Sequence, residues 1–103
     1  MATKEQYLKS AKALEKKGLY ERAGDMYGKV RNFDNALENY EKAVAEAEEA
    51  YNKNKLASTY LETASRNRHK IAGVYDKLGL KKKAKKENIK ASIEWQQSFL
   101  GSF

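Results

Sequence analysis

Apolar residues recur every three or four positions along almost the whole chain, which is the spacing of one face of an α-helix. The first segment to do so carries Tyr7, Leu8, Ala11 and Leu14. Thr3 and Gln6 precede it at the spacing of a capping box, and Gly18 follows as a plausible helix stop. No segment alternates polar and apolar residues over a useful length, so the pattern predicts an all-α fold without a sheet.

The same periodicity continues to the end of the chain and divides it into five antiparallel helices. We predict them at about residues 3–17, 19–31, 33–52, 54–79 and 81–98. Asn32 or Asp34 is placed to cap the third helix. The apolar stripe of the fourth segment falters at Asn67 and Arg68, which leaves either one long helix or two with a break near Ser65; the continuing spacing favours one.

Small and aromatic residues repeat with a common spacing. It is present in Ala23-x-x-x-Tyr27, again in Ala36-x-x-x-Tyr40, and in a looser form from Tyr75 to Ala84. This spacing resembles that of tetratricopeptide repeats, and the phrase from Tyr20 to Tyr27 resembles the variant found in soluble NSF attachment proteins. Ala23 and Ala57 are 34 residues apart, whereas Ala57 and Ala84 are 27 apart, so the array is irregular.

The resemblance implies one domain over residues 1–103, built as a short right-handed superhelix of about two and a half helix-pair repeats. It also implies a scaffold that binds proteins or peptides, rather than the vesicle-fusion role of the much longer attachment proteins. With the repeat phase set by these motifs, the groove of such a scaffold would carry Lys12, Lys16, His69 and Lys77.

Composition agrees with a small helical domain. The chain has 103 residues, no proline and 34% charged residues, and its length corresponds to a single domain. It has no cysteine, which excludes disulfides, thiolate metal sites and cysteine nucleophiles. The N-terminus lacks the apolar stretch of a secretory signal, so we expect a soluble, cytoplasmic protein; Met1 and the capping box favour a natural start.

The residues that catalysis requires are missing. His69 is the only histidine, and its sequence neighbours are basic rather than carboxylates that could orient it. Successive carboxylates such as Glu46, Glu48 and Glu49 cannot aim at one metal ion from a single helix. There is no glycine-rich phosphate loop. We therefore expect no enzyme, no cofactor and no metal.

The net charge of +7 is unevenly distributed. Residues 34–50 hold six acids and one lysine, whereas residues 66–90 hold ten basic residues and two acids. The basic residues predicted to form one edge are Arg66, Arg68, Lys70, Lys81, Lys82, Lys83, Lys85 and Lys86. Such an edge favours an acidic protein or peptide partner. Three alternatives stay open: a solvated helix start, nucleic-acid binding, and binding to an anionic membrane.

The last helix has apolar residues on two sides. One stripe, expected to pack on the preceding helix, consists of Ala84, Asn88, Ala91, Trp95 and Phe99. Nearly opposite lie Ile89, Ile93 and Leu100. A terminal helix can bury only one stripe on one neighbour, so we hypothesise that the second side is an interface for a partner or for a second copy of the chain, in which case the protein is a structural homo-oligomer.

Overall fold

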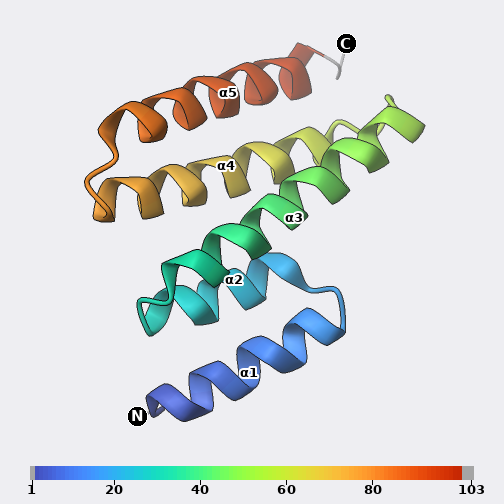
Figure 1. Cartoon of the computed structure of the whole chain (residues 1–103). Helices are drawn as coiled ribbons and strands as arrows, with labels where there is room; N and C mark the ends of the chain where they lie inside the picture. Colours follow the sequence, from blue (N-terminus) through green and yellow to red (C-terminus); the bar gives the residue numbers. More distant parts are fainter. Residues whose placement is uncertain (1, 101–103) are drawn as a thin grey trace.

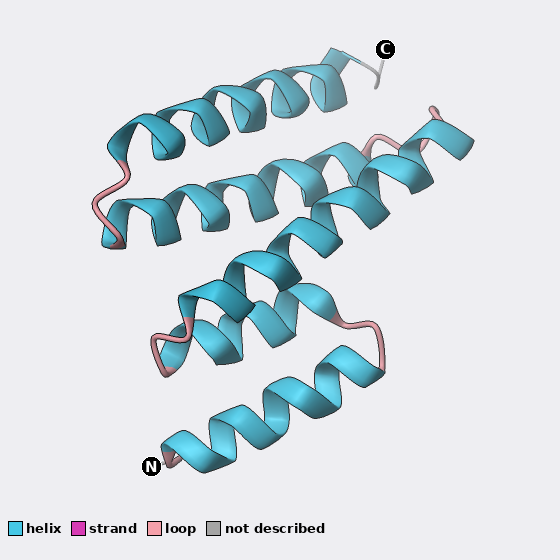
Figure 2. Ribbon diagram, viewed as in Figure 1, coloured by secondary structure: helices cyan, strands magenta, loops and turns pink. Residues whose placement is uncertain are grey.

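The structure of the chain is a computed structural model that describes residues 2–100, all of whose regular structure is helical (Figures 1 and 2). The helices are α1 (Lys4–Lys16), α2 (Tyr20–Lys29), α3 (Phe33–Lys53), α4 (Thr59–Lys77) and α5 (Lys81–Leu100). No strand occurs in this range, so the prediction of an all-α fold with five helices is confirmed. The first residue and the last three of the predicted domain lie outside the described residues.

The helices are stacked in the order of the sequence, each packing on the one before it and the one after it (Figure 1). The stack measures 46 × 32 × 20 Å, so its shape is elongated rather than spherical. α3 is more than twice as long as α2, and its C-terminal half therefore extends past the start of α2 and contacts α4 (Figure 1).

The helix ends follow the expected chemistry. Thr3 and Gln6 form a complete capping box, in which each side chain accepts a hydrogen bond from the backbone N–H of the other residue. Gly18 and Gly79 both have φ +76°, the left-handed conformation that closes a helix at low cost for glycine. Of the two candidate caps for the third helix, Asn32 takes the role: its side chain accepts from the N–H of Asn35 at 3.4 Å.

The fourth helix starts later than predicted. The periodicity suggested residues 54–79, but α4 begins at Thr59, and residues 54–58 form a turn. Oδ1 of Asn54 accepts from the N–H of Leu56 at 3.3 Å, a local bond that competes with helix formation, and the Leu56 side chain is 90% exposed. The preference for a single helix through Asn67 and Arg68 is confirmed.

The core combines very small residues with tyrosines. Ala11, Ala23 and Ala36 are fully buried, which allows the helix backbones to approach closely, and the rings of Tyr27 and Tyr40 fill the space beside them. Each buried tyrosine hydroxyl has a carboxylate acceptor: Tyr27 donates to Glu15, and Tyr40 donates to Asp25 at 2.6 Å. Burial, reinforced by these bonds, raises the pKa of Tyr27 to about 12 and raises that of Tyr40 further.

None of the helices between residues 2 and 100 combines the length and the apolar character that crossing a bilayer requires.

Candidate functional site

The last helix packs on α4 through small and polar side chains. The residues of α5 that are buried against α4 are Ala84, Ala91, Glu94 and Ser98, whereas its large apolar side chains are exposed. Ala84 and Ala91 of the predicted packing stripe are buried, but the prediction was wrong for Asn88, Trp95 and Phe99: Asn88 is exposed, Trp95 is 55% exposed and Phe99 is 63% exposed. The face that α5 turns to α4 is displaced from the predicted one by roughly 60° around the helix axis, at ~100° per residue.

Polar groups on α4 account for this rotation. Oγ of Ser65 donates to the carbonyl of Ala91 at 2.8 Å, a contact that requires α5 to approach α4 through small residues. Arg68 then draws in two carboxylates of α5, Glu87 through Nη1 at 3.2 Å and Glu94 through Nε. Burying Trp95 instead would break these charge-assisted bonds and leave Arg68 without two of its partners.

Arg68 is the centre of an ion cluster that joins three helices. Its third partner is Glu48 of α3, whose carboxylate lies 2.7 Å from Nη2. Only 16% of the Arg68 side chain is exposed, so the guanidinium is largely shielded from solvent. Burial alone would lower the pKa of Arg68, but the hydrogen bonds to Glu48 and Glu94 outweigh it and raise the pKa.

Two of these carboxylates, Glu48 and Glu94, contact each other as well as the Arg68 guanidinium. Burial and the hydrogen bond with Glu48 outweigh the lowering effect of Arg68, and together these interactions raise the pKa of Glu94 from 4.5 to about 7. Burial also acts on Glu48, but hydrogen bonds with Glu94 and Arg68 lower the pKa of this carboxyl overall. The cluster therefore holds a proton on Glu94 under mildly acidic conditions.

We expect Glu94→Gln to stabilise the fold at pH 8 by on the order of 1–2 kcal/mol and to change little at pH 5. The pKa of Glu94 is raised in the folded chain, so its contribution to stability is full below pH 4.5 and is lost as the pH rises through about 7. Glutamine keeps the acceptor for Arg68 but carries no charge to desolvate. Urea denaturation at several pH values measures the difference. An equal effect of the substitution at pH 5 and pH 8 would contradict this account.

Two of the predicted basic-edge residues, Arg66 and Lys70, lie on the side of α4 that faces α2. Both form ion pairs with carboxylates of that helix. Arg66 makes a bidentate contact with Glu21 at 2.7 Å, and Lys70 contacts Glu21 at 2.8 Å and Asp25 at 3.0 Å. The hydrogen bonds from Arg66 lower the pKa of Glu21 to about 2. The structure corrects the predicted grouping: Arg66, Arg68 and Lys70 neutralise carboxylates of their own chain and do not join the lysines of α5 in one patch.

The lysines of α5 itself remain exposed. Lys81 contacts Asp76 at 3.4 Å, and Lys83 lies over the ring of Tyr75 with its Nζ 5.7 Å from the ring centre. Lys82, Lys85 and Lys86 form no ion pair with any residue in the range 2–100. Because Glu87 and Glu94 turn inward, every exposed charged side chain of α5 is a lysine.

The outward side of α5 carries a heptad pattern that continues these lysines into an apolar row. With spacings that alternate between four and three, the pattern runs through Lys82, Lys86, Ile89, Ile93, Gln96 and Leu100. We call these six residues the outer seam. All six are exposed: Ile89 by 51%, Ile93 by 50% and Leu100 by 68%. Alternating spacings of this kind are those of a helix that packs along a second helix.

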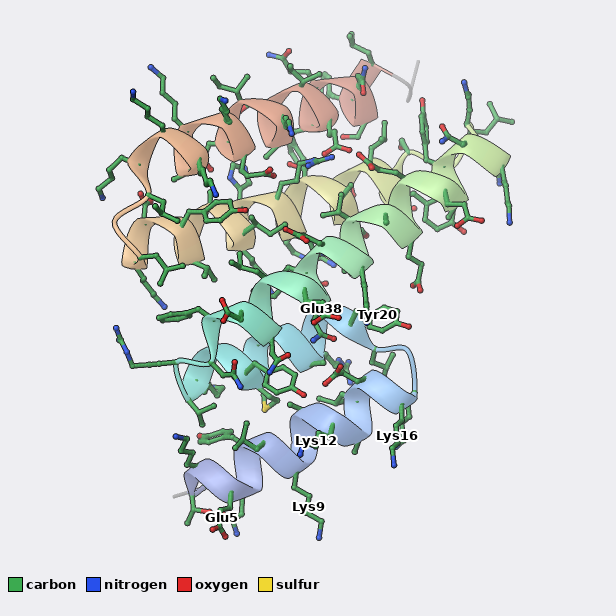
Figure 3. All side chains as sticks on the ribbon, viewed as in Figure 1. Glu5, Lys9, Lys12, Lys16, Tyr20 and Glu38 are labelled. Atoms are coloured by element: carbon green, nitrogen blue, oxygen red, sulfur yellow. The ribbon has the colours of Figure 1, made fainter. Side chains whose placement is uncertain are left out.

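The four predicted groove residues are not brought together. Lys12 and Lys16 lie on α1, and Figure 3 shows Lys16 pointing away from the rest of the stack. His69 and Lys77 lie on α4, on the far side of α2 and α3 (Figure 1). His69 Nδ1 is 2.9 Å from Oδ1 of Asn88, and Lys77 Nζ lies 5.9 Å from the ring centre of Phe33. Within the described residues there is no group of three or more side chains suited to hold a metal ion.

No family model, curated protein or solved structure matches this chain. The tetratricopeptide assignment therefore stays a prediction from the small–aromatic spacing. Sequence reasoning did identify Ile89, Ile93 and Leu100 as an unburied side of the last helix, but it missed that they continue the lysine tract in one heptad row. The 4–3 spacing from Lys82 to Leu100 was the signal that could have revealed it.

Proposed function

We propose that this chain is a non-catalytic protein-binding module, and that its partner presents an amphipathic helix to the outer seam of α5. The observation that carries the proposal is the row of exposed apolar side chains in direct heptad continuation of unpaired lysines. A partner helix with apolar residues opposite Ile89, Ile93 and Leu100 would supply affinity by burial. Acidic residues opposite Lys82 and Lys86 would set its register and speed its association.

Charge complementarity favours such a partner over a second copy of the chain. Two copies of α5 in parallel would place lysines against lysines at two of the six seam positions. In the antiparallel arrangement Ile89 meets Ile93, but Lys82 and Lys86 meet no carboxylate, because the acids of α5 are bound to Arg68. Each copy also adds a net charge of +7. A homo-oligomer is therefore the weaker candidate.

The arrangement of charge along α5 also favours a helix over a membrane or a nucleic acid. Helices that lie in a bilayer surface carry basic and apolar residues on opposite faces. In the outer seam they follow one another along the same face, with lysines at one end and apolar residues at the other. Nucleic-acid phosphates would bind the lysines but leave Ile89, Ile93 and Leu100 without a partner.

A designed helix tests the proposal directly. The probe is a labelled peptide of about three heptads with Glu opposite Lys82 and Lys86 and Leu opposite the apolar positions. We expect saturable binding of the labelled peptide, measured by fluorescence anisotropy. Ile89→Glu/Ile93→Glu should weaken binding by at least about tenfold, and Lys82→Glu/Lys86→Glu should reverse the preference to a basic peptide.

Lys12→Glu/Lys16→Glu on α1 is the matched control, because it changes the net charge equally at the other end of the stack. It should leave binding unchanged. If this control weakens binding as much as the α5 charge reversal does, the interaction is with net charge and not with the seam. Dimerisation that Ile89→Glu/Ile93→Glu abolishes, seen by sedimentation, would replace the proposed partner with a second copy. Equal binding to vesicles rich in phosphatidylserine would replace it with a membrane.

A further inference from the structure

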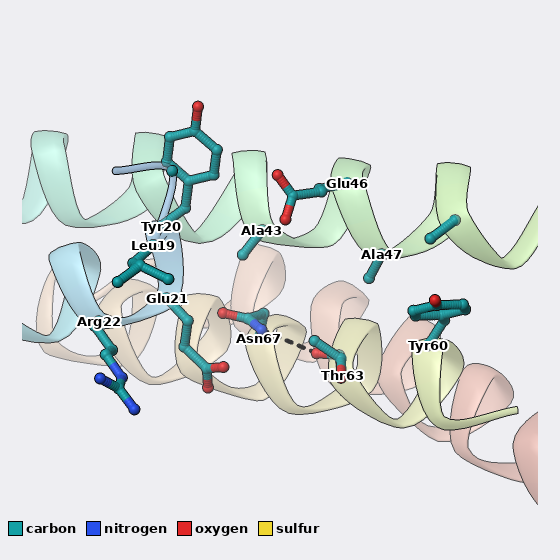
Figure 4. A pocket seen from close by; sticks show the side chains of 12 residues that line it. Leu19, Tyr20, Glu21, Arg22, Ala43, Glu46, Ala47, Tyr60, Thr63 and Asn67 are labelled. Carbon is teal, nitrogen blue, oxygen red and sulfur yellow. Dashed lines mark hydrogen bonds between the residues drawn. The ribbon is translucent and has the colours of Figure 1, made fainter. Parts of the chain in front are cut away.

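A cavity of about 320 Å³ opens where the start of α2 meets α3 and α4, far from the outer seam (Figure 4). One wall is a row of small side chains on α3, Ala43, Ala47 and Ala50. Thr63 and Asn67 of α4 form the opposite wall, and Figure 4 shows them facing Ala43 and Ala47. The side chain of Tyr60 closes one end. The volume is at the lower limit of known ligand pockets.

The cavity results from unequal helix lengths. α2 begins only at Tyr20, so it covers the first half of α3 and leaves the second half beside α4 uncovered on that side (Figure 1). Alanine on α3 leaves a gap there that larger side chains would fill. The gap therefore depends on the alanines at positions 43, 47 and 50 of α3. No residue of the outer seam lines it.

A buried polar atom without a partner lies in the wall. Asn67 is fully buried, and its Nδ2 donates to the carbonyl of Thr63 at 2.9 Å. Its Oδ1 accepts no hydrogen bond from any residue between 2 and 100. In Figure 4 this oxygen points toward the end of the cavity where Leu19 and Glu21 lie. A buried acceptor left unpaired is costly and rare, so it marks a place where a donor is missing.

The start of α2, whose first backbone N–H groups have no side-chain cap from the described residues, borders the same cavity. The start of α2 lines the cavity from Leu19 to Arg22, and no side chain among the described residues caps this helix end. The first N–H groups of a helix need an acceptor from outside it. Leu19, which is 43% exposed, lines this end of the cavity. The free charges at the mouth, Arg22 and Glu46, are of opposite sign and favour a neutral group.

We infer that this cavity binds a short extended peptide segment. An aliphatic side chain of that segment lies against Ala43 and Ala47, and one of its main-chain N–H groups donates to Oδ1 of Asn67. The adjoining main-chain carbonyl accepts from the uncapped start of α2. A peptide group supplies both the donor and the acceptor that the cavity lacks, which a purely apolar ligand does not. This site is independent of the outer seam and of the function proposed for it.

Small peptide analogues test the inference by ¹H–¹⁵N correlation spectra of the full chain. The probe is N-acetyl-leucine methylamide, and its comparison is the analogue in which both N–H groups are methylated. We expect saturable shifts at Ala43, Ala47 and Asn67 with the first probe. The methylated analogue should bind at least about fivefold more weakly, the loss expected from one hydrogen bond. Absence of saturable shifts at these amides, or equal binding of the two probes, would overturn the inference.

Variants separate a specific site from loose apolar binding. Asn67→Leu should remove the preference between the two probes and, by removing an unpaired buried acceptor, raise the Tm by roughly 4 °C or more. Asn39→Leu is the matched control, because Asn39 is equally buried with an unpaired Oδ1 but does not line the cavity; it should leave the preference intact. Ala50→Leu should block both probes, whereas Ala45→Leu on the exposed side of α3 should block neither. Retention of the preference in Asn67→Leu would contradict the assigned bond.

Binding of these probes should be the same in Ile89→Glu/Ile93→Glu as in the original chain. A loss of probe binding in that variant would place the interaction on α5 and overturn the cavity assignment. Failure of the designed helix to bind α5 leaves the peptide-analogue titration unaffected, so the two proposals fail separately.

Discussion

Arg68→Met should lower the free energy of unfolding by about 3–5 kcal/mol, the largest loss we expect from a single substitution on the α4–α5 side of the stack. The variant keeps the aliphatic stem but removes the guanidinium that Glu48, Glu87 and Glu94 share, and the only other cation paired with them is Lys90, 3.8 Å from Glu87, among the described residues. Urea denaturation followed by circular dichroism measures the loss. Because protonation relieves the repulsion, the loss should shrink markedly at pH 4.

The destabilisation by Arg68→Met should also be concentrated in α5. α5 buries only small or polar side chains against α4, so the Arg68 cluster supplies much of what holds it. Amide hydrogen exchange in Arg68→Met should therefore show α5 opening at a lower free energy than α3. Arg22→Met is the control, since Arg22 is exposed and forms no ion pair with a described residue; it should cost less than about 0.5 kcal/mol. Equal costs for the two substitutions would show that the cluster is unimportant.

The polarity of α5 connects stability with the proposed function. A helix that buries Ile89, Ile93 and Leu100 against α4 would have no apolar row left for a partner. Here Arg68 and Ser65 hold α5 by charge and hydrogen bonds, which leaves that row facing outward. The same interactions that orient α5 thus determine what it exposes. A partner that covers the outer seam would bury apolar surface on both sides of α5 and stabilise its docking.

Local rules predicted most of the helices well, because the start and end of a helix depend mainly on residues close in sequence. The capping box at Thr3 and the stop at Gly18 form as their spacing indicates, and Ala23 and Tyr27 are both buried. The start of α4 was missed because Asn54 forms a local bond with the backbone of Leu56 in place of a helical one.

The candidate site was less predictable, because it depends on pairs far apart in sequence. Hydrophobic periodicity alone placed Trp95 in the α4–α5 contact, but it cannot weigh the ion pair between Arg68 and Glu94, 26 residues apart. The faltering stripe at Asn67 and Arg68 was a real signal. It marked a helix with polar groups on its buried side, one of them in the ion cluster and the other in the cavity wall.

Gly24→Ala should destabilise the fold by about 1–3 kcal/mol, although alanine is the better helix former. A Cβ at this position would lie 2.6 Å from Cε1 and 2.8 Å from Cδ1 of the Tyr40 ring. The ring cannot easily withdraw, because it is 5% exposed and its hydroxyl is bound to Asp25, which Lys70 also holds. Thermal and urea denaturation measure the loss.

Two other helical glycines are the matched controls for this prediction. A Cβ added at Gly28 or Gly73 meets no atom within 4 Å, so only the helix propensity changes there. Gly28→Ala and Gly73→Ala should each stabilise the fold by roughly 0.5–1 kcal/mol. In a Tyr40→Leu background the ring is gone, and Gly24→Ala should then lose most of its cost and approach these controls. If its cost were unchanged in that background, close approach of α2 to the Tyr40 ring could not be the reason for glycine at this position.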